Sequence, residues 1–231
     1  MTQEQESEGK SIADLVKKIQ ELATSLEFSK GREENLEGQV DHYKALSTLD
    51  EQTGIPNYRG ICDFLKRTMK AANRDAYKQR ESDESDSRAA LTIALLDLND
   101  FGQYNKGGDH IEGDKILRHF AEFVSGNLLR PLDFVGRFGG DEFFVGFPYT
   151  PIEGAHINLD RLGKLMKGPN APKVSYTGGV VQYDPDKHET PEELLADASG
   201  TCMKGNKLEP GKVYSVINGR IQAYSSNGTD Q

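Results

Sequence analysis

The sequence is poor in the features that disulfide-bonded, membrane-spanning and nucleic-acid-binding proteins need. Its 231 residues include two cysteines, Cys62 and Cys202, which are too few for a disulfide framework or a thiolate metal site. No apolar run approaches the roughly 20 residues of a membrane span, and the start, MTQEQESEGK, lacks the parts of a signal peptide. The net charge of −9 argues against general affinity for nucleic acid or anionic lipid. We therefore expect a soluble cytoplasmic protein with no nucleic-acid partner.

Two common enzyme signatures are also missing. The chain has no Gly-x-x-x-x-Gly-Lys-Ser/Thr loop, which argues against a P-loop enzyme. Its five histidines contain no His-x-x-x-His spacing of a metalloprotease. Hydrophobic residues make up 35% and charged residues 28%, which suffices for one full-sized domain with an appendage or for two small domains.

The first part of the chain, residues 1–48, carries an apolar stripe with the spacing of a heptad repeat. Its members recur at intervals of three and four residues: Ile12, Leu15, Ile19, Leu22, Leu26, Leu36, Val40 and Tyr43. Polar Ser29 and Glu33 interrupt the stripe near Gly31, so we expect the helix to weaken or break there. A stripe this narrow needs a cover, which is either a second copy in a coiled coil or the chain's own globular domain.

We expect a globular domain over residues 49–220 and a polar tail over 221–231. Hydrophobic periodicity and turn residues predict helices around 61–69, 117–128 and 157–166 and another from Thr190, with strands over 91–98, 134–138, 143–147, 174–183 and 213–217. The charged tract over 79–88 is expected to be an exposed loop. This pattern indicates an α/β fold with a central mixed sheet.

Acidic residues gather at the ends of two predicted strands. Asp97 closes a buried strand, and Asp141 and Glu142 follow a pair of glycines. If the two strands are neighbours, Asp97 and Asp141 face each other and repel, and a Mg²⁺ ion held by both carboxylates and by substrate phosphates would remove that conflict. The alternative is that these acids simply cap turns.

The pair Gly139-Gly140 has two interpretations of its own. Without Cβ atoms, these residues let a phosphate chain approach the backbone and its N–H groups. The same pair is also typical of an ordinary hairpin turn.

Residues 137–143 read RFGGDEF, and the chain resembles the GGDEF family of diguanylate cyclases over roughly residues 47 to 217. Further motifs carry the resemblance at the spacing of the family: Asp50-x-x-Thr53-Gly54-Ile55-Pro56-Asn57, Asp97-Leu98-Asn99-Asp100-Phe101, Asn105, and Gly113-Asp114. The resemblance implies a nucleotidyl-cyclase-like fold whose central sheet is mainly antiparallel and surrounded by helices.

The same resemblance implies an enzyme that condenses two GTP molecules into cyclic di-GMP and releases two pyrophosphates. Each subunit would hold one GTP, so the active site would form between the facing subunits of a homodimer that the N-terminal coiled coil brings together. Two Mg²⁺ ions per site, replaceable by Mn²⁺, are implied as cofactors. A regulatory protein acting through the N-terminal helix is a further expected partner.

The family's catalytic and metal positions fall on acids of this chain. By resemblance, Asp97, the backbone carbonyl of Leu98 and Asp141 hold the metal ions, which neutralise the triphosphate. Glu142 is implied to help hold metal and to accept the proton of the 3′-hydroxyl group.

The family's substrate positions can be carried over in the same way. The resemblance assigns GTP binding to Phe101, Asn105, Asp114, Gly139-Gly140 and Lys204. Asn105 and Asp114 would read the guanine edge, because a carboxylate accepts from the N1–H and N2–H₂ donors that adenine lacks. Lys204 would bind phosphate.

An inhibitory site is implied upstream of the glycine pair. Arg130 and Asp133 form an Arg-x-x-Asp motif that ends shortly before Gly139, at the spacing of the family's product-binding site. An arginine can stack on guanine and fork to its N7 and O6 atoms, and the aspartate can accept from its N–H groups. The alternative is a surface ion pair.

The chain departs from the family pattern at several positions. Asn99 replaces the second aspartate of the Asp-x-Asp motif, Gly102 stands where lysine is usual, and Lys106 stands where an aspartate is usual. The segment after Lys204 also diverges, although Lys207 offers a positive charge there. These differences leave two other hypotheses open: a non-catalytic receptor for cyclic di-GMP, and a GTP-sensing scaffold.

Overall fold

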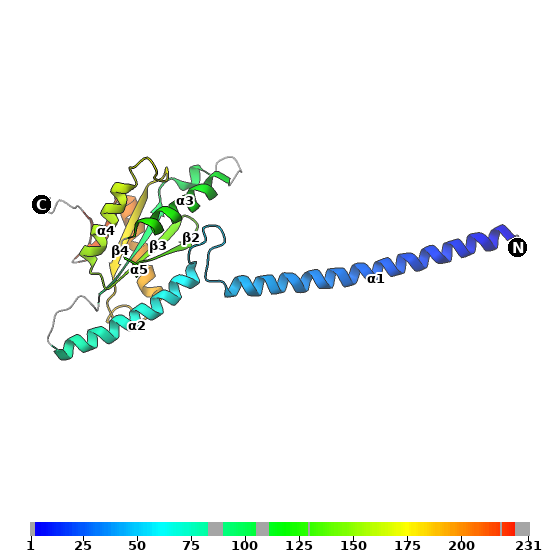
Figure 1. The fold of residues 1–231 in the computed structure, drawn as a ribbon, viewed down its shortest axis with the longest axis horizontal. Helices are drawn as coiled ribbons and strands as arrows, with labels where there is room; N and C mark the ends of the chain where they lie inside the picture. The colour runs from blue at the N-terminus through cyan, green and yellow to red at the C-terminus, as the bar shows by residue number, and fades with distance from the viewer. Residues whose placement is uncertain (1–2, 83–89, 105–110, 129, 218, 225–231) are drawn as a thin grey trace. The chain divides into compact units, whose positions relative to one another are not determined.

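The computed structural model describes the backbone of residues 3–82, 90–104, 111–128, 130–217 and 219–224. The chain divides into two compact units, Met1–Ser47 and Thr48–Gln231. The second unit holds a six-stranded sheet with helices on both faces, as Figure 1 shows.

The first unit is one long helix, α1 (Gln3–Leu46). It runs without interruption through Ser29, Gly31 and Glu33, so the predicted break is wrong. A single helical glycine costs only about 1 kcal/mol relative to alanine, and the flanking lysines, arginines and glutamates favour helix. Side chains of the heptad stripe are more than half exposed at Leu15, Ile19, Leu22 and Leu26. Among the described residues, no helix combines the length and apolarity needed to cross a bilayer.

The sheet of the second unit has the strand order β2-β3-β1-β4-β5-β6. Its strands are β1 (Leu91–Leu98), β2 (Phe134–Gly139), β3 (Glu142–Pro148), β4 (Tyr176–Gln182), β5 (Val213–Ile217) and β6 (Arg220–Ala223). The β4–β5 pair is parallel and the other four pairs are antiparallel. The mixed, mainly antiparallel sheet expected for this chain is therefore confirmed.

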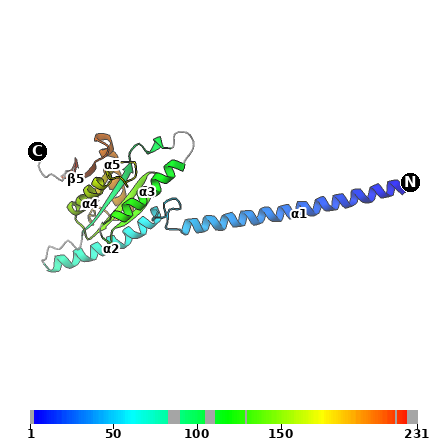
Figure 2. The same cartoon turned by 45° about the horizontal axis from the view of Figure 1, so that its top comes forward.

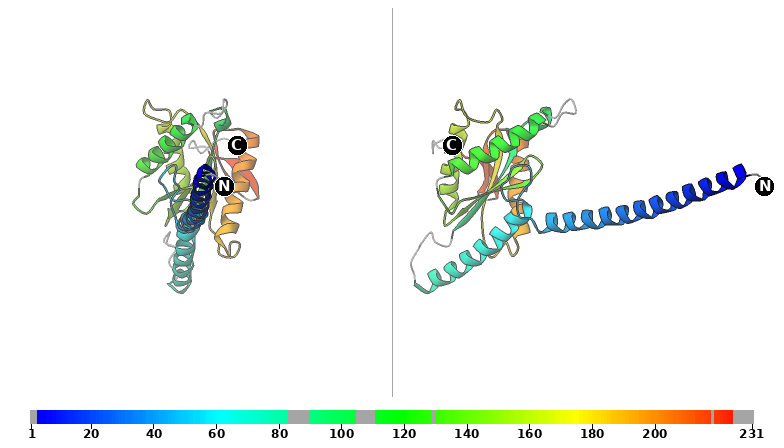
Figure 3. Two further views of the ribbon diagram at one scale, coloured as in Figure 1. Left: turned by 90° about the vertical axis from the view of Figure 1, so that its right-hand side faces the viewer. Right: turned by 45° about the vertical axis from the view of Figure 1, so that its right-hand side comes forward.

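Helices cover both faces of this sheet. They are α2 (Tyr58–Ser82), α3 (Ile111–Asn127), α4 (Ile152–Leu165) and α5 (Pro191–Leu208), with a short 3₁₀ turn, η2 (Phe101–Gln103). Figure 2 shows the same elements from a second angle, and the left view of Figure 3 shows α3 and α4 on one side of the sheet and α5 on the other.

The central strand β1 contributes to two hydrophobic cores. Ile93 and Leu95 pack in the core beneath α2 and α5, whereas Leu96 and Leu98 pack in the core beneath α3 and α4. Side chains of a strand alternate between faces, so Asp97 lies on the α5 side. Burial on both faces explains the continuous apolar run of β1.

Helix α5 packs unusually close to the sheet. A Cβ atom on Gly179 of β4 would lie 2.4 Å from the Ala198 carbonyl oxygen and 2.4 Å from the Cys202 nitrogen, so only glycine fits. The helix begins with a capping box in which the Thr190 side chain accepts from the Glu193 N–H and the Glu193 side chain accepts from the Thr190 N–H. Both features fix the position of α5 beside the end of β1.

Several predicted boundaries differ from the structure. Helix α2 continues to Ser82 into the tract expected to be a loop, whose remaining residues 83–88 lie outside the described part. Helix α4 begins at Ile152 rather than at 157, and β4 begins at Tyr176 rather than at 174. Strand β6 was not predicted, although it pairs with β5 and occupies the first residues of the expected polar tail.

Candidate functional site

Three carboxylates converge where β1 ends beside the start of β3. Asp97 and Glu142 are directly paired residues of the antiparallel β1–β3 ladder. The Leu98 N–H donates to the Asp141 carbonyl oxygen over 3.2 Å, which places Asp141 beside the last residue of β1. These acids were predicted to gather at strand ends, and the strand pairing brings the three together.

The converging carboxylates repel one another. The pKa of Asp97 is raised by burial and by the nearby charge of Asp141, and a hydrogen bond from Asn206 partly opposes the shift. Burial, followed by the charges of Asp97 and Asp141, raises the pKa of Glu142. Such a cluster attracts a cation, because a positive charge relieves both the burial cost and the repulsion.

The glycine turn beside the acids is open. Strand β2 ends at Gly139, which pairs with Glu142, so Gly140 and Asp141 form the turn, one residue later than predicted. Gly140 has a φ of 54°, a left-handed conformation that favours glycine. Apart from the adjoining residues, no atom of the described part of the chain lies within 4 Å of a Cβ built on Gly139 or Gly140. A ligand can therefore approach this backbone closely.

The Arg137 side chain stabilises the glycine turn through hydrogen bonds to its backbone. Its Nε and Nη2 atoms donate to the Gly140 carbonyl oxygen over 2.9 and 2.7 Å, a bidentate contact. Its Nη1 atom also pairs with Asp50 at 3.0 Å. Burial by itself would raise the pKa of Asp50, but hydrogen bonds from Thr53 and Arg137 and the charge of Arg137 lower it overall. The Asp50 motif is thus a support for the glycine turn.

A polar network lies beneath Asp97; we call it the Asn99 network, and its members are Asn99, Ser175, Thr177, Asn206 and Gly211. Asn206 donates to Asp97 over 3.1 Å. The Thr177 hydroxyl group lies 2.8 Å from the Asn99 amide oxygen and 3.1 Å from that of Asn206, and it accepts from the Gly211 N–H over 2.9 Å. Asn99 also donates to the Ser175 hydroxyl over 2.8 Å. Asn99 therefore links the end of β1 to the start of β4 rather than adding a fourth acid to the group.

Asp114, the expected guanine reader, lies in the first turn of α3. Its carboxylate accepts a hydrogen bond from the amide of Gln52, and the oxygen of Gln52 accepts from Arg137. Asp114 is thereby connected to the glycine turn through two side chains. Phe101 is 9% exposed and belongs to the core beneath α3. Asn105 lies outside the described residues, so its predicted role stays a prediction.

The expected phosphate lysine lies on α5. Lys204 and Lys207 are both exposed, and neither forms an ion pair with another residue that the structure describes. Asn206, between them, turns toward Asp97 instead. The role of Lys204 therefore stays a prediction.

Arg130 and Asp133 line a separate pocket of about 530 Å³. The Asp133 Oδ2 atom accepts from the Arg130 N–H over 3.2 Å, and the guanidinium group of Arg130 donates to the Thr150 hydroxyl over 2.9 Å. The Asp133 Oδ1 atom is buried without a hydrogen-bond partner among the described residues. Burial raises the pKa of Asp133, and the N–H and charge of Arg130 oppose this shift. The Asp133 carboxylate thus contacts the Arg130 backbone while the Arg130 guanidinium group contacts Thr150, and the inhibitory role of the two residues stays a prediction.

The donor set suits a hard divalent cation shared with a phosphate ligand. Among the described residues, no group of three or more His, Cys, Asp and Glu side chains is arranged to hold a metal by itself. A site for Mg²⁺ does not need one, because this ion is usually held by one or two carboxylates together with substrate phosphates and water.

Sequence reasoning missed four supporting residues: Gln52, Arg137, Thr177 and Asn206. Arg137 belongs to the RFGGDEF motif, but its contacts join segments more than 80 residues apart, which the motif does not indicate. Thr177 looked like an ordinary strand residue. Gly205-Asn206 lies in the segment that diverges from the family pattern, and nothing in the sequence indicates that Asn206 contacts Asp97. No local pattern reveals such roles, because they arise from strand pairing and from the packing of α5.

Comparisons with known proteins agree with this geometry. A family model described as "Diguanylate cyclase, GGDEF domain" matches residues 47–210. Diguanylate cyclase DgcP of Pseudomonas aeruginosa is 31% identical over 69% of this chain, and cyclic di-GMP phosphodiesterase NbdA of the same species is 35% identical over 50%. These matches span only 21% and 16% of those two proteins.

A solved structure shares the fold. The chain superimposes on diguanylate cyclase SiaD, crystallised with its activator SiaC from Pseudomonas aeruginosa, with a TM-score of 0.57 at 23% identity, over 92% of this chain and 85% of the other. The family match covers well over half of the chain and includes the acids and the glycine turn. The chain therefore belongs to the GGDEF-domain family of diguanylate cyclases.

Proposed function

We propose that this protein condenses two GTP molecules into cyclic di-GMP and releases two pyrophosphates. The observation that carries the proposal is the pairing of Asp97 with Glu142 across β1 and β3, beside a glycine turn with open space at its surface. Asp141 completes the group of acids at the same strand ends. This arrangement offers charge for metal ions and room for a triphosphate.

Asp97, the backbone carbonyl of Leu98 and Asp141 are the proposed metal ligands. Two Mg²⁺ ions, replaceable by Mn²⁺, would supply charge that stabilises the pyrophosphate leaving group. The raised pKa of Asp97 reflects burial and repulsion that a bound cation relieves. The hydrogen bond from Asn206 leaves the second oxygen of Asp97 available and fixes the orientation of the carboxylate.

Glu142 is the proposed proton acceptor for the 3′-hydroxyl group that attacks the α-phosphate. Its pKa is raised by burial and by the neighbouring acids, and a more basic carboxylate is the better acceptor in a proton transfer. As one new P–O bond forms, the bond to pyrophosphate breaks, and the proton leaves the hydroxyl for the carboxylate.

Asp114 and Asn105 are the proposed readers of the guanine edge, with Phe101 and Lys204 completing the substrate site. The Asp114 carboxylate accepts the same kind of N–H₂ donor from Gln52 that guanine presents. Gly139 and Gly140 would admit the phosphates, since no side chain covers them.

The pocket at Arg130 and Asp133 is the proposed inhibitory site for cyclic di-GMP. Its volume of about 530 Å³ lies in the range of small-molecule sites, roughly 300–1,000 Å³. The unpaired Oδ1 atom of Asp133 is an acceptor without a partner in the described chain, which suits the N–H groups of guanine. Product bound there would restrain Pro56, which also lines the pocket and accepts from the Arg137 N–H over 2.7 Å.

A homodimer is the proposed working form, because one subunit holds a single GTP and the reaction needs two. The exposed heptad stripe of α1 is the proposed contact between copies. A regulatory protein that binds this helix is a further proposed partner.

The second candidate function is a receptor that binds cyclic di-GMP at Arg130 and Asp133 without turnover. One observation favours it: Gly102 stands where the family usually has a lysine, and this exposed residue has no side chain to reach a phosphate. The intact group of Asp97, Asp141 and Glu142 favours the cyclase.

The deciding experiment incubates purified protein with GTP and Mg²⁺ and measures cyclic di-GMP by mass spectrometry. We expect product from the unmodified chain and a loss of about 100-fold or more for Glu142→Gln, within the usual range for a proton acceptor. Arg130→Ala should keep the initial rate and allow product to accumulate past the level at which the unmodified protein stops. Cyclic di-GMP binding by a dimer that makes no product would select the receptor.

A further inference from the structure

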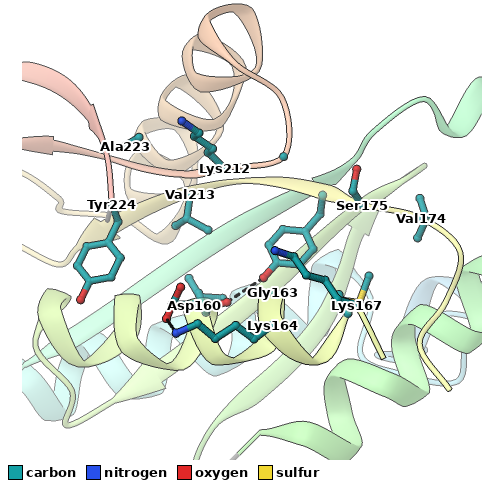
Figure 4. Close-up of a pocket in the computed structure, with 14 residues that line it drawn as sticks. Asp160, Gly163, Lys164, Lys167, Val174, Ser175, Lys212, Val213, Ala223 and Tyr224 are labelled. Atoms are coloured by element: carbon teal, nitrogen blue, oxygen red, sulfur yellow. Dashed lines mark hydrogen bonds and ion pairs between the residues drawn. The ribbon is translucent and has the colours of Figure 1, made fainter. Parts of the chain in front are cut away.

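A second pocket of about 540 Å³ lies away from the acids and from Arg130. Helix α4 forms one wall, and β4, β5 and β6 form the other. Figure 4 shows this cavity, with Tyr224 at one end and Ser175 at the other. The proposed cyclase reaction uses none of its side chains. Its volume is in the range of sites for small ligands, roughly 300–1,000 Å³.

The pocket is positively charged in a chain whose net charge is −9. Three lysines and one aspartate line it. Lys164 pairs with Asp160 at 2.7 Å, and Lys212 pairs with Glu209 at 2.7 Å. Lys167 has no ion-pair partner among the described residues, and Figure 4 shows its side chain extending across the pocket. One cation is therefore available for an anionic group.

The pocket also offers apolar and aromatic surface. Leu159, Val174 and Val213 contribute aliphatic side chains to its walls. The ring of Tyr224 stacks on the buried ring of His156 with centroids 4.3 Å apart and an angle of 7° between the planes. The Tyr224 N–H donates to the Val213 carbonyl oxygen over 2.8 Å. The tyrosine is thus a fixed aromatic end wall.

We propose that this pocket binds a small aromatic monoanion. The planar body of the ligand would lie against the aliphatic wall and Tyr224, and its carboxylate or sulfonate group would pair with Lys167. A small ligand with an apolar ring and one negative charge matches both surfaces of the pocket. A ring alone would leave Lys167 without a partner, and an anion alone would leave the apolar wall uncovered. The inference concerns binding and is independent of the proposed cyclase activity.

Two residues connect the pocket to the rest of the molecule. Ser175 and Gly211 line the pocket and are also members of the Asn99 network. That network reaches Asp97 through Asn206. A ligand in the pocket would therefore contact Ser175 and Gly211. Changes in the amide chemical shifts of these two residues report binding at this pocket rather than at the glycine turn.

Gly163 supplies a variant that closes the pocket without disturbing the fold. It lies on α4 and lines the cavity, and a Cβ atom built on it meets only the Tyr176 hydroxyl at 3.8 Å, an ordinary contact. A Gly163→Leu side chain would enter the pocket, and the helix itself favours leucine over glycine. Gly200→Leu on α5 is the matched control, because outside its own helix turn no described residue has an atom within 4 Å of its Cβ position and it does not line the pocket.

The test titrates the full chain with 1-naphthalenesulfonate, without GTP or divalent metal, and follows binding by calorimetry and by amide chemical shifts. We expect one site per chain, shifts at Ser175 and Gly211, and affinity at least tenfold weaker in Gly163→Leu but unchanged in Gly200→Leu. Lys167→Ala should also weaken binding about fivefold, with exposed Lys173→Ala as its control.

Two further probes separate the parts of the ligand. Naphthalene carries the ring without the charge, and inorganic sulfate carries the charge without the ring; both should bind at least tenfold more weakly than the sulfonate. Equal affinity for either probe, or binding that Gly163→Leu leaves unchanged, would overturn the proposal. Because these measurements contain no GTP, a failure here is distinct from a failure of the cyclase assay.

Discussion

At the scale of single residues, the glycine turn shows how two neighbouring residues of one type have different tasks. Gly140 needs glycine for its backbone, since its φ of 54° is left-handed. Gly139 has no such requirement, and only the empty space at its surface distinguishes it. Gly140 is therefore required by the backbone conformation of the turn, whereas Gly139 is required only if a ligand approaches the turn.

Alanine at each position should reveal that difference. Gly140→Ala should lower the free energy of unfolding by about 1–2 kcal/mol, the cost of placing a residue with a Cβ atom in the left-handed region. Gly139→Ala should change it by less than about 0.5 kcal/mol, as is usual for exposed sites, and yet weaken GTP binding, because its methyl group occupies the phosphate path. Chemical denaturation and GTP titration measure the two effects. Equal stability losses would contradict the assignment.

Arg137 gives a second test at this scale. Lysine keeps the charge but cannot fork to the Gly140 carbonyl oxygen while pairing with Asp50. We expect Arg137→Lys to lower the free energy of unfolding by about 2 kcal/mol, comparable to one lost hydrogen bond to a charged group, and to reduce GTP turnover about tenfold. Arg118→Lys, at an exposed position of α3, is the control and should behave like the unmodified chain.

The acids of the site were predictable from sequence, and their supports were not. Asp97, Asp141 and Glu142 stand at strand ends that hydrophobic runs reveal. Gln52 and Asn206 carry no such mark, because the partners they contact lie 62 and 109 residues away. Asn99 was recognised as a departure, but its bonds to β4 depend on a register that sequence alone does not give.

At the scale of elements, the buried strands and the capped helix α5 were predicted, whereas the edge strand β6 was missed. Strand β1 is a continuous apolar run and α5 carries its capping box in the sequence. Strand β6 has a burial pattern with no fully buried residue, so no apolar alternation marked it. It follows a Gly219 turn with a φ of 75° and pairs with β5. The backbone ladder, rather than side-chain burial, forms this strand.

Tyr224, which directly follows β6, stacks on His156 of α4, and we expect this contact to depend on pH. Burial lowers the pKa of His156 to about 4 from an ordinary 6.5, with Glu153 opposing. The unfolded chain therefore binds the proton more tightly, so stability should fall as pH drops from about 6.5 toward about 4.

His156→Phe keeps a ring against Tyr224 and removes the proton site. The pH dependence of the unfolding free energy should become shallower between about 6.5 and about 4 in this variant than in the unmodified chain. Urea denaturation at a series of pH values measures the slope. His119→Phe, at an exposed histidine of α3, should leave the slope as it is. Identical slopes for all three proteins would show that His156 titrates normally.

At the scale of the whole molecule, we expect the apolar stripe of α1 to pair with the same stripe of a second copy. Its unit contains one helix, and the apolar stripe along it is exposed, with Ile19 at 62% and Leu22 at 64%. Two copies of such a stripe bury each other in a coiled coil. The proposed reaction between two GTP-loaded subunits would gain from that union, because tethering raises the local concentration of the second half-site.

Charge placed in the stripe should separate assembly from chemistry. We expect Leu22→Asp to be monomeric in analytical ultracentrifugation and to lose at least tenfold in cyclase rate at micromolar protein. Its rate per chain should rise with protein concentration, because the catalytic unit itself is intact and only the encounter is weakened. Thr24→Asp adds the same charge on the opposite face of the helix and should remain dimeric and active. A Leu22→Asp monomer that keeps full activity at every concentration would show that the stripe serves a different partner and that the two half-sites meet without it.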